Sequence, residues 1–401
     1  MHSSHLSKDA TRCVHAGEDR HGIRAPITTP IAQTSVFVLP DVEDLRRSAQ
    51  GKSDAYLYTR YANPTTAVAE QKIAALEGAE ECVVTSSGMA AVLCAVLAGL
   101  KAGDEIVSML DIYGGTLRLF EEVLPQFGIT SRLVPHAGLS QVERYFSART
   151  AMLFLESPTN PILRCADLAS LAAVAHQRNI AVLVDNTFAT PILQKPLALG
   201  ADMVMHSATK YLGGHSDVTA GAVAGSHEWM VKVRERMKLT GGCLDPLCSY
   251  LLIRGLKTLE IRVERACHNA RLIAEFLCQN ARVEQVHYPG LPSHAAHALV
   301  CRQMRNFGMM LAFDIKGAHR GIADGQGAAA EVFINRLQLW YLATSLGGVE
   351  STVSYPILSS HAGLSDDRLH ELGVSPATIR LSVGIESATD LIADLEQALG
   401  I

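Results

Sequence analysis

The chain has 401 residues, of which 48% are hydrophobic and 19% charged, a composition typical of a folded globular protein and not of a disordered one. Lys and Arg total 35 against 40 Asp and Glu, a net charge of −5, which excludes the broad basic surface that nucleic-acid and anionic-membrane binders use. We therefore expect small molecules and further copies of the chain as partners.

Other classes are excluded by local patterns. The nine cysteines are odd in number and scattered, mostly in apolar runs, which predicts reduced thiols and a cytoplasmic protein. Cys243 and Cys248 lack the second pair or the histidine spacing of a zinc site, so no metal is expected. The polar N-terminal segment argues against a secretory signal, and the longest apolar run, Met89 to Leu100, is too short to span a bilayer.

The chain begins with a segment that cannot bury itself. Residues 1 to about 60 show no sustained period and are rich in Thr, Pro, Ser and His, which predicts an arm lying over another surface. The arm ends in Tyr58-Thr59-Arg60, followed by a turn at Asn63-Pro64. An ordinary loop with exposed polar side chains explains this cluster equally well.

From Thr66 onward, helices and short apolar strands alternate. A helix is predicted over 66–78, because its apolar residues are spaced helically and it stops at Gly78. Strands are predicted at 82–84, 105–107, 132–134, 152–155, 181–184 and 203–205, with helices between them. This alternation predicts a parallel or mostly parallel sheet covered on both faces. Ligands bind at the carboxyl ends of such strands, where five residues fall: Gly88, Tyr113, Asn160, Asp185 and Lys210.

The last third of the chain has a different pattern. A long helical stretch runs from Leu244 to Arg282, and extended segments at 309–315 and 337–343 follow, with helices near 328–335 and 388–399. This predicts a smaller α+β domain. The expected division is an arm over 1–62, a cofactor-binding α/β domain over 63–250 and the α+β domain over 251–401.

Lys210 is the strongest candidate for chemistry. It lies just past a short apolar strand, with Ser207 and Thr209 beside it and Gly213-Gly214 behind. A lysine held desolvated in such a place is a nucleophile that can form an imine, or Schiff base, with a carbonyl cofactor, and the hydroxyls suit a phosphate. A lysine after a strand is, however, more often a solvated surface residue.

Two further features point to the cofactor. Asp185 closes the apolar strand 181–184, although it could also be a helix N-cap. Ser87-Gly88-Met89 leads from a strand into a helix, whose N-terminus suits a phosphate. An imine lysine, a carboxylate for a pyridinium nitrogen and a phosphate site are what pyridoxal phosphate requires, so we predict this cofactor.

At these residues the chain resembles the Cys/Met-metabolism, or trans-sulfuration, family of pyridoxal-phosphate enzymes, which includes cystathionine and methionine γ-lyases and cystathionine γ-synthase. The resemblance runs nearly end to end through the segments 58–65, 87–90, 111–116, 156–161, 184–187, 207–211 and 345–348. It implies an enzyme of fold type I, in which a mostly parallel seven-stranded sheet lies between helices. It also implies a homotetramer built from two dimers.

The resemblance implies a role for each site residue. Lys210 would be the imine lysine and proton shuttle, Asp185 would keep the pyridine nitrogen protonated, and Tyr113 would stack on the ring and act as acid or base at the leaving group. The phosphate would be bound by Ser87, Gly88, Met89, Ser207 and Thr209, and by Tyr58 and Arg60 of a neighbouring subunit.

Substrate contacts are implied in the same way. Arg380, with Ser345 nearby, would bind the substrate carboxylate, and Asn160 would meet that carboxylate or the ring hydroxyl. Structural alternatives stay open: Arg380 could form an inter-strand ion pair and Tyr113 could be a core residue. His206 and His215 flank the lysine, but we expect packed or solvent-facing side chains there.

The reaction is less firmly indicated. A glutamate often precedes the Ser-Leu-Gly-Gly motif in family members that act on cystathionine, whereas this chain has Thr344; methionine γ-lyases usually have a cysteine where this chain has Gly115. We favour γ-elimination on a γ-substituted four-carbon amino acid, giving 2-oxobutyrate and ammonia. Alternatives are γ-replacement with a thiol, by an O-acylhomoserine sulfhydrylase or a cystathionine γ-synthase, cystathionine β-elimination, and a leaving group other than sulfur.

Two other classes fit less well. A nucleotide-binding dehydrogenase needs a Gly-x-Gly-x-x-Gly string after an early strand, and the nearest string, at 325–330, follows no strand. A non-catalytic protein that binds pyridoxal phosphate also stays open.

Overall fold

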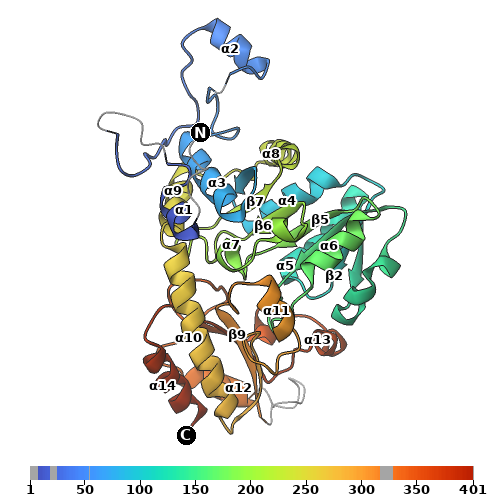
Figure 1. Ribbon diagram of the computed structural model, residues 1–401, viewed down its shortest axis with the longest axis vertical. Helices are drawn as coiled ribbons and strands as arrows, with labels where there is room; N and C mark the ends of the chain where they lie inside the picture. Colours follow the sequence, from blue (N-terminus) through green and yellow to red (C-terminus); the bar gives the residue numbers. More distant parts are fainter. Residues whose placement is uncertain (1–7, 19–24, 54, 317–327, 401) are drawn as a thin grey trace.

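The computed structural model describes residues 8–18, 25–53, 55–316 and 328–400. The glycines of the 325–330 string lie outside these residues. Two sheets organise the described chain, one of seven strands and one of five, and the long helix α10 runs alongside the second (Figure 1).

The secondary structure alternates as the sequence predicts. The strands are β1 (Glu81–Thr85), β2 (Glu105–Met109), β3 (Thr130–Val134), β4 (Thr150–Glu156), β5 (Ala181–Asp185), β6 (Met203–His206), β7 (Gly221–Gly225), β8 (Val283–His287), β9 (Met310–Ile315), β10 (Tyr341–Leu342), β11 (Thr352–Ser354) and β12 (Thr378–Ser382). The α-helices are α1 (Asp9–His15), α2 (Val42–Ala49), α3 (Pro64–Glu77), α4 (Gly88–Gly99), α5 (Gly114–Arg118), α6 (Leu168–His176), α7 (Thr190–Leu193), α8 (His227–Thr240), α9 (Pro246–Leu256), α10 (Leu259–Gln279), α11 (His297–Gln303), α12 (Ala328–Arg336), α13 (Asp366–Leu372) and α14 (Ala388–Leu399).

The seven-stranded sheet has the order β1-β7-β6-β5-β4-β2-β3. β7 is antiparallel to β1 and β6, and the other neighbours are parallel, so the sheet is mostly parallel as predicted. Alternate residues of β1 belong to different apolar cores, Val83 to one and Cys82 and Val84 to the other. Both faces of the sheet are therefore covered, which explains why its strands read as continuous apolar runs.

One strand escaped prediction. β7 has the sequence Gly-Ala-Val-Ala-Gly, whose small residues give little strand signal. The small side chains have a packing reason, because a Cβ atom on Gly221 would lie 2.1 Å from the carbonyl oxygen of Ser87. β7 thus lets the start of α4 approach the sheet closely.

The predicted long helix is two helices, since Lys257 and Thr258 separate α9 from α10. α9 packs against α3, whereas α10 packs against helix α14 and against strands β8 and β9. These two strands belong to the five-stranded sheet, whose order is β10-β11-β12-β9-β8. Of the extended segment predicted at 337–343, only Tyr341–Leu342 is a strand. The division at residues 62 and 250 stays a prediction.

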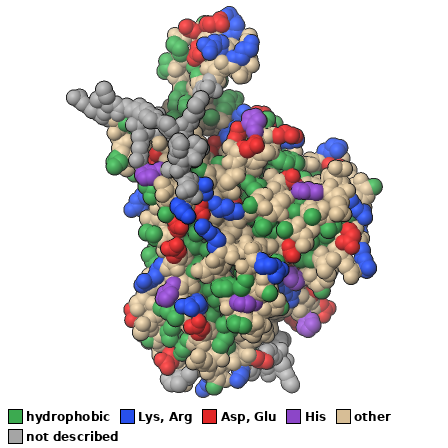
Figure 2. All heavy atoms as spheres, viewed as in Figure 1, with side chains coloured by type: hydrophobic (Ala, Val, Ile, Leu, Met, Phe, Trp, Pro, Cys, Tyr) green, Lys and Arg blue, Asp and Glu red, His purple; other side chains and the backbone are tan. Residues whose placement is uncertain are grey.

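The segment of the arm that carries α2 projects from the body of the molecule (Figure 1). α2 buries none of its residues, and Val38 is 98% exposed. Apolar side chains are visible on this projection in Figure 2. The expectation that the arm cannot bury itself is therefore wrong for α1, which packs against α3 and α10 of the same chain and buries Asp9 and Cys13, whereas the segment around α2 has few contacts within this chain.

The packing of α9 behind the Lys210 turn can be tested. A Cβ atom on Gly255 would lie 2.1 Å from the carbonyl oxygen of Gly213. Overpacking of this kind costs ~1–3 kcal/mol, against a gain of about 1 kcal/mol in helix propensity. We expect Gly255→Ala to lower the free energy of unfolding, as measured by urea denaturation.

The control is Arg254→Ala, on the exposed side of the same helix, which should change stability by less than about 0.5 kcal/mol. A Gly255→Ala protein as stable as the wild type would show that the two segments are not in close contact.

Candidate active site

A cavity of about 580 Å³ opens at the carboxyl ends of the larger sheet's strands. It brings together all the predicted site residues except two: Ser87, Gly88, Met89, Tyr113, Asn160, Asp185, Ser207, Thr209, Lys210, Thr344, Ser345 and Arg380. These residues follow β1, β2, β4, β5 and β6 or come from the smaller sheet and its loops. The cavity therefore lies where the two layers meet.

Lys210 is held as a poorly solvated amine. Its Nζ donates a hydrogen bond to Ser345 Oγ, 2.7 Å away. Burial, and then the positive charge of Arg380, lower the pKa of Lys210 from 10.5 to about 8. Because the neutral amine is the nucleophilic and basic form, this environment prepares the side chain for attack on a carbonyl or for proton transfer near neutral pH.

The start of α4 lines the cavity through Ser87, Gly88 and Met89. Ser87 caps the helix, since its side chain accepts a hydrogen bond from the amide of Ala90 at 3.1 Å. A Cβ atom on Gly88 would lie 2.9 Å from Ser207 Cβ, so glycine is required for this approach. Thr209 Oγ1 is fixed by two hydrogen bonds to the backbone of Ala220. A helix N-terminus facing hydroxyls suits a phosphate.

Two buried carboxyl groups lie side by side in the lining of the same cavity. Asp185 ends β5 and pairs in register with Glu156 at the end of β4. The amide of Thr187 donates to Asp185 Oδ1 at 2.9 Å, and burial raises the pKa of Asp185 above its usual value. Burial and the neighbouring Asp185 raise the pKa of Glu156 well above its usual value. Glu156 was not predicted as a site residue, although it closes an apolar strand just as Asp185 does.

Arg380 provides a buried positive charge. Only 3% of the residue is exposed, its Nη1 donates to Asn160 Oδ1 at 2.7 Å and its Nη2 to the carbonyl oxygen of Ser345 at 3.2 Å. Among the described residues, Arg380 forms no ion pair, and its Nε has no hydrogen-bond partner. The alternative of an inter-strand ion pair is therefore wrong, and the unpaired guanidinium suits an incoming carboxylate.

Tyr113 is half exposed, at 49%, so it is not a core residue. Its amide donates to Glu156 at 2.8 Å, which fixes the start of α5. A Cβ atom on Gly115 would lie 2.6 Å from Tyr113 Cε1. The ring therefore occupies the space that a side chain at position 115 would need.

Tyr58 and Arg60 do not line the described cavity. Arg60 donates from Nη1 to the carbonyl oxygen of Lys238 at 2.7 Å and stacks beside Tyr58 and Tyr61. Their contribution to a neighbouring subunit's site stays a prediction. His206 is fully buried, and His215 lies partly exposed with Nδ1 near the carbonyl oxygen of Gly213.

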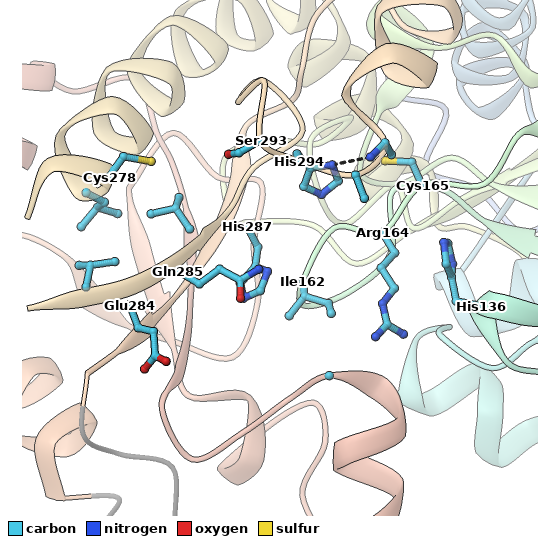
Figure 3. Close-up of a pocket in the computed structure, with 16 residues that line it drawn as sticks. His136, Ile162, Arg164, Cys165, Cys278, Glu284, Gln285, His287, Ser293 and His294 are labelled. Atoms are coloured by element: carbon cyan, nitrogen blue, oxygen red, sulfur yellow. Dashed lines mark hydrogen bonds between the residues drawn. The ribbon is translucent and has the colours of Figure 1, made fainter.

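A second cavity, of about 670 Å³, lies on another part of the molecule (Figure 3). His136, Arg164, His287 and His294 line it, together with residues of β8. Its charged groups are largely paired, as Arg164 is with Asp111 at 2.7 Å. In the described part of the chain, no group of three or more His, Cys, Asp or Glu side chains is arranged to hold a metal ion. None of the described helices is long and apolar enough to cross a membrane.

Comparison with known proteins identifies the family to which the chain belongs. Residues 10–400 match the model of the Cys/Met metabolism PLP-dependent enzyme family. The chain belongs to the Cys/Met-metabolism family of pyridoxal-phosphate-dependent enzymes. Both the predicted family and the predicted cofactor are thus confirmed.

Relatives of this Cys/Met-metabolism enzyme carry out different reactions. The chain is 41% identical over 392 residues to an L-methionine gamma-lyase of Fusobacterium nucleatum, covering 97% of each chain. It is 40% identical over 390 residues to a cystathionine beta-lyase of Lactococcus lactis, covering 97% of this chain and 98% of the relative. The crystal structure of metB from Corynebacterium glutamicum superimposes with a TM-score of 0.90 at 38% identity, covering 98% of each chain. The fold is fold type I, as predicted.

The residues of this cavity fit pyridoxal phosphate. An amine of lowered pKa, a buried carboxyl and a glycine-lined helix N-terminus all face one space, and the Gly88 cradle leaves room where any other residue would place a Cβ atom.

The effect of Arg380 on Lys210 can be measured in the protein without cofactor. Since the guanidinium lowers the pKa of Lys210, we expect Arg380→Gln to raise it from about 8 toward 10.5. At pH 8 the fraction of neutral amine then falls. The measurement is the pH dependence of Lys210 acetylation by a small amine reagent, followed by mass spectrometry.

Arg380→Lys keeps the positive charge and serves as the control, with a midpoint close to that of the wild type. If Arg380→Gln left the midpoint at about 8, the repulsion between the two cations would be refuted.

Proposed function

We propose that this enzyme is a lyase that catalyses γ-elimination on a γ-substituted four-carbon amino acid, such as homocysteine or methionine, and releases 2-oxobutyrate and ammonia. The observation that carries the proposal is the composition of the cavity. Among the described lining residues the acids are Asp185 and Glu156, which are buried and neighbouring, and Thr344 is neutral, so it offers no carboxylate to the distal ammonium of a substrate such as cystathionine.

The proposal assigns the cofactor contacts to residues already described. Lys210 would hold the aldehyde carbon and Asp185 the ring nitrogen, while Ser87, Gly88, Met89, Ser207 and Thr209 would bind the phosphate. When bound, pyridoxal phosphate supplies an electron sink for negative charge developing at the substrate's Cα.

The side chains of the cavity then orient the substrate and move protons. Arg380 binds the substrate carboxylate, with Asn160 fixing the guanidinium. The neutral amine of Lys210 would accept the proton from Cα and hand it back to another atom of the bound substrate and cofactor, which leaves the amine neutral again to accept a proton from Cβ, as its lowered pKa permits. Tyr113, held at the cavity wall through its amide, delivers a proton to the leaving group at Cγ.

Of the alternatives, γ-replacement begins with the same two proton transfers, whereas β-elimination needs only the proton from Cα. Capture by a thiol would make the enzyme a γ-replacement catalyst, and β-elimination on cystathionine would give pyruvate. The relatives include both a γ-lyase and a β-lyase at almost the same identity, so product analysis decides between these reactions. The residues around Thr344 also accommodate a leaving group other than sulfur.

We also propose that the active enzyme is at least a dimer. The described arm exposes Val36, Val38 and Val42, which have no cover within one chain. Tyr58 and Arg60 lie at the base of this arm. Their hydroxyl and guanidinium groups would donate hydrogen bonds to a phosphate bound by a second subunit.

The direct test is product analysis with Lys210→Ala as the comparison. We expect the wild type to release 2-oxobutyrate from γ-substituted amino acids without added thiol, and Lys210→Ala to lose more than about 10²- to 10⁴-fold in turnover, because it removes both base and cofactor anchor. Keto acids from a panel of β- and γ-substituted amino acids are identified by chromatography.

Pyruvate as the only keto acid would replace γ-elimination with β-elimination. Turnover of Lys210→Ala close to the wild-type rate would reject the proposed site as a whole.

The role of Thr344 gives a separate test. We expect Thr344→Glu to increase kcat/KM for cystathionine relative to homocysteine, because it places a carboxylate at the cavity mouth near the distal ammonium. An exposed charge pair is worth up to ~1 kcal/mol, so the ratio should change by about fivefold. Thr344→Gln, of the same size without the charge, should leave the ratio unchanged, and an equal change in both variants would contradict the charge argument.

A further inference from the structure

Beside the active-site cavity lies another cavity of about 450 Å³, which we call the distal cavity. Thr344, Leu358 and Ser359 line both cavities, so these side chains form the boundary between them. Thr344 is exposed and Leu358 is 62% exposed, so neither is packed into a core. Exposed side chains change rotamer rapidly. The boundary between the two cavities is therefore thin and adjustable.

The smaller sheet also places the two cavities next to each other. Ser354 of β11 lines the distal cavity and pairs in register with Arg380 of β12, which lines the active site. Residues directly opposite one another on antiparallel strands project from the same face of the sheet, with Cβ atoms about 4.5–5.5 Å apart. A substrate carboxylate bound by Arg380 therefore lies one strand away from the distal cavity. Ser354 Oγ has no hydrogen-bond partner among the described residues, so it can donate to a heteroatom of that substrate.

The described lining of the distal cavity is mainly apolar and contains no basic residue. Its hydrocarbon and aromatic surface comes from Ile334, Leu342, Ala343, Tyr355 and Leu358. Its acid is Glu331 of α12, which forms no ion pair with a described residue. Burial, and then the negative charge of Glu331, raise the pKa of Tyr355 to about 12. Such a lining favours an uncharged apolar group and repels a carboxylate.

We propose that the distal cavity is the subsite for the substituent at Cγ of the substrate, and that it selects long, uncharged substituents such as an unbranched alkyl chain joined through sulfur or oxygen. This inference rests on the proposed function, in which Arg380 binds the substrate carboxylate. The substituent passes between Thr344 and Leu358, and Glu331 disfavours substituents that end in a carboxylate.

The test uses substrate analogues without a leaving group, so that binding is measured without the reaction. Straight-chain L-2-amino acids of increasing length, namely 2-aminobutyrate, 2-aminohexanoate, 2-aminooctanoate and 2-aminodecanoate, are titrated into the holoenzyme, and calorimetry gives each dissociation constant. We expect the affinity to increase by about fourfold for each methylene group that leaves water.

The role of Glu331 is tested with 2-aminosuberate, which has the chain length of 2-aminooctanoate but ends in a carboxylate. It should bind more weakly than 2-aminooctanoate. Glu331→Gln should reduce the difference between the two ligands by up to about fivefold, because it removes an exposed like charge. An unchanged difference would refute the role of Glu331.

Ala343→Phe, which places a ring in the distal cavity, should abolish the gain in affinity between 2-aminohexanoate and 2-aminodecanoate. Its control is Val332→Phe, which adds the same ring at an exposed position of α12 outside the lining of both cavities and should keep the wild-type dependence on chain length. Leu342→Asp, at a side chain that is 64% exposed and so not needed for folding, places a charge in the distal cavity and should also abolish the gain.

A dissociation constant that does not depend on chain length in the wild type would overturn the inference. A wild-type dependence in both Ala343→Phe and Leu342→Asp would overturn it as well, because the chain would then bind elsewhere. Failure of the proposed function gives a different result. Pyruvate as the only keto acid would change the assigned reaction and leave the length dependence intact, whereas release of 2-oxobutyrate without a length dependence would reject only the distal subsite.

Discussion

The candidate active site depends on keeping ionisable groups away from water without letting them form ion pairs with one another. Lys210 and Arg380 are basic residues in the lining of one cavity, and Asp185 and Glu156 are acidic residues in the same lining. In the described chain none of these cations is paired with one of these acids, although in water such groups would attract one another. The two layers hold them apart: β4, β5 and β6 supply the acids and the amine, and the smaller sheet supplies Arg380 on β12. Separation is possible because each group is anchored by neutral partners, as Asn160 anchors Arg380.

The fold places these groups by simple means. Parallel strands end on the same edge of a sheet, so residues that close β4, β5 and β6 meet without long excursions of the chain. The antiparallel strand β7, made of small residues, lets the N-terminus of α4 reach the same edge. The start of α4 and the ends of β4 and β5 therefore meet opposite requirements, close approach of small residues in the first case and burial of carboxyl groups in the second.

Sequence patterns predicted much of this and missed parts for physical reasons. Apolar runs predicted the parallel strands. The motifs around Lys210, Asp185 and Gly88 predicted which residues line one cavity, because each motif combines a chemical group with a strand end. β7 was missed because Gly and Ala have little strand preference. The break between α9 and α10 was missed because Lys257 and Thr258 both continue the helical pattern of the sequence. The hydrogen bond between Glu77 and His206 joins buried residues 129 positions apart and depends on packing that no local pattern encodes.

The lining of the cavity combines residues that are fixed by close packing with residues that lie outside the larger sheet. Close packing fixes the start of α4, because Gly88 against Ser207 and Gly221 against Ser87 leave no space for a larger side chain. Thr344 and the loop residues Leu358, Ser359 and Ser360 border the cavity without belonging to any strand of the larger sheet. Substitutions at these bordering positions can therefore change which substrate side chain fits without disturbing the strand ends of the larger sheet.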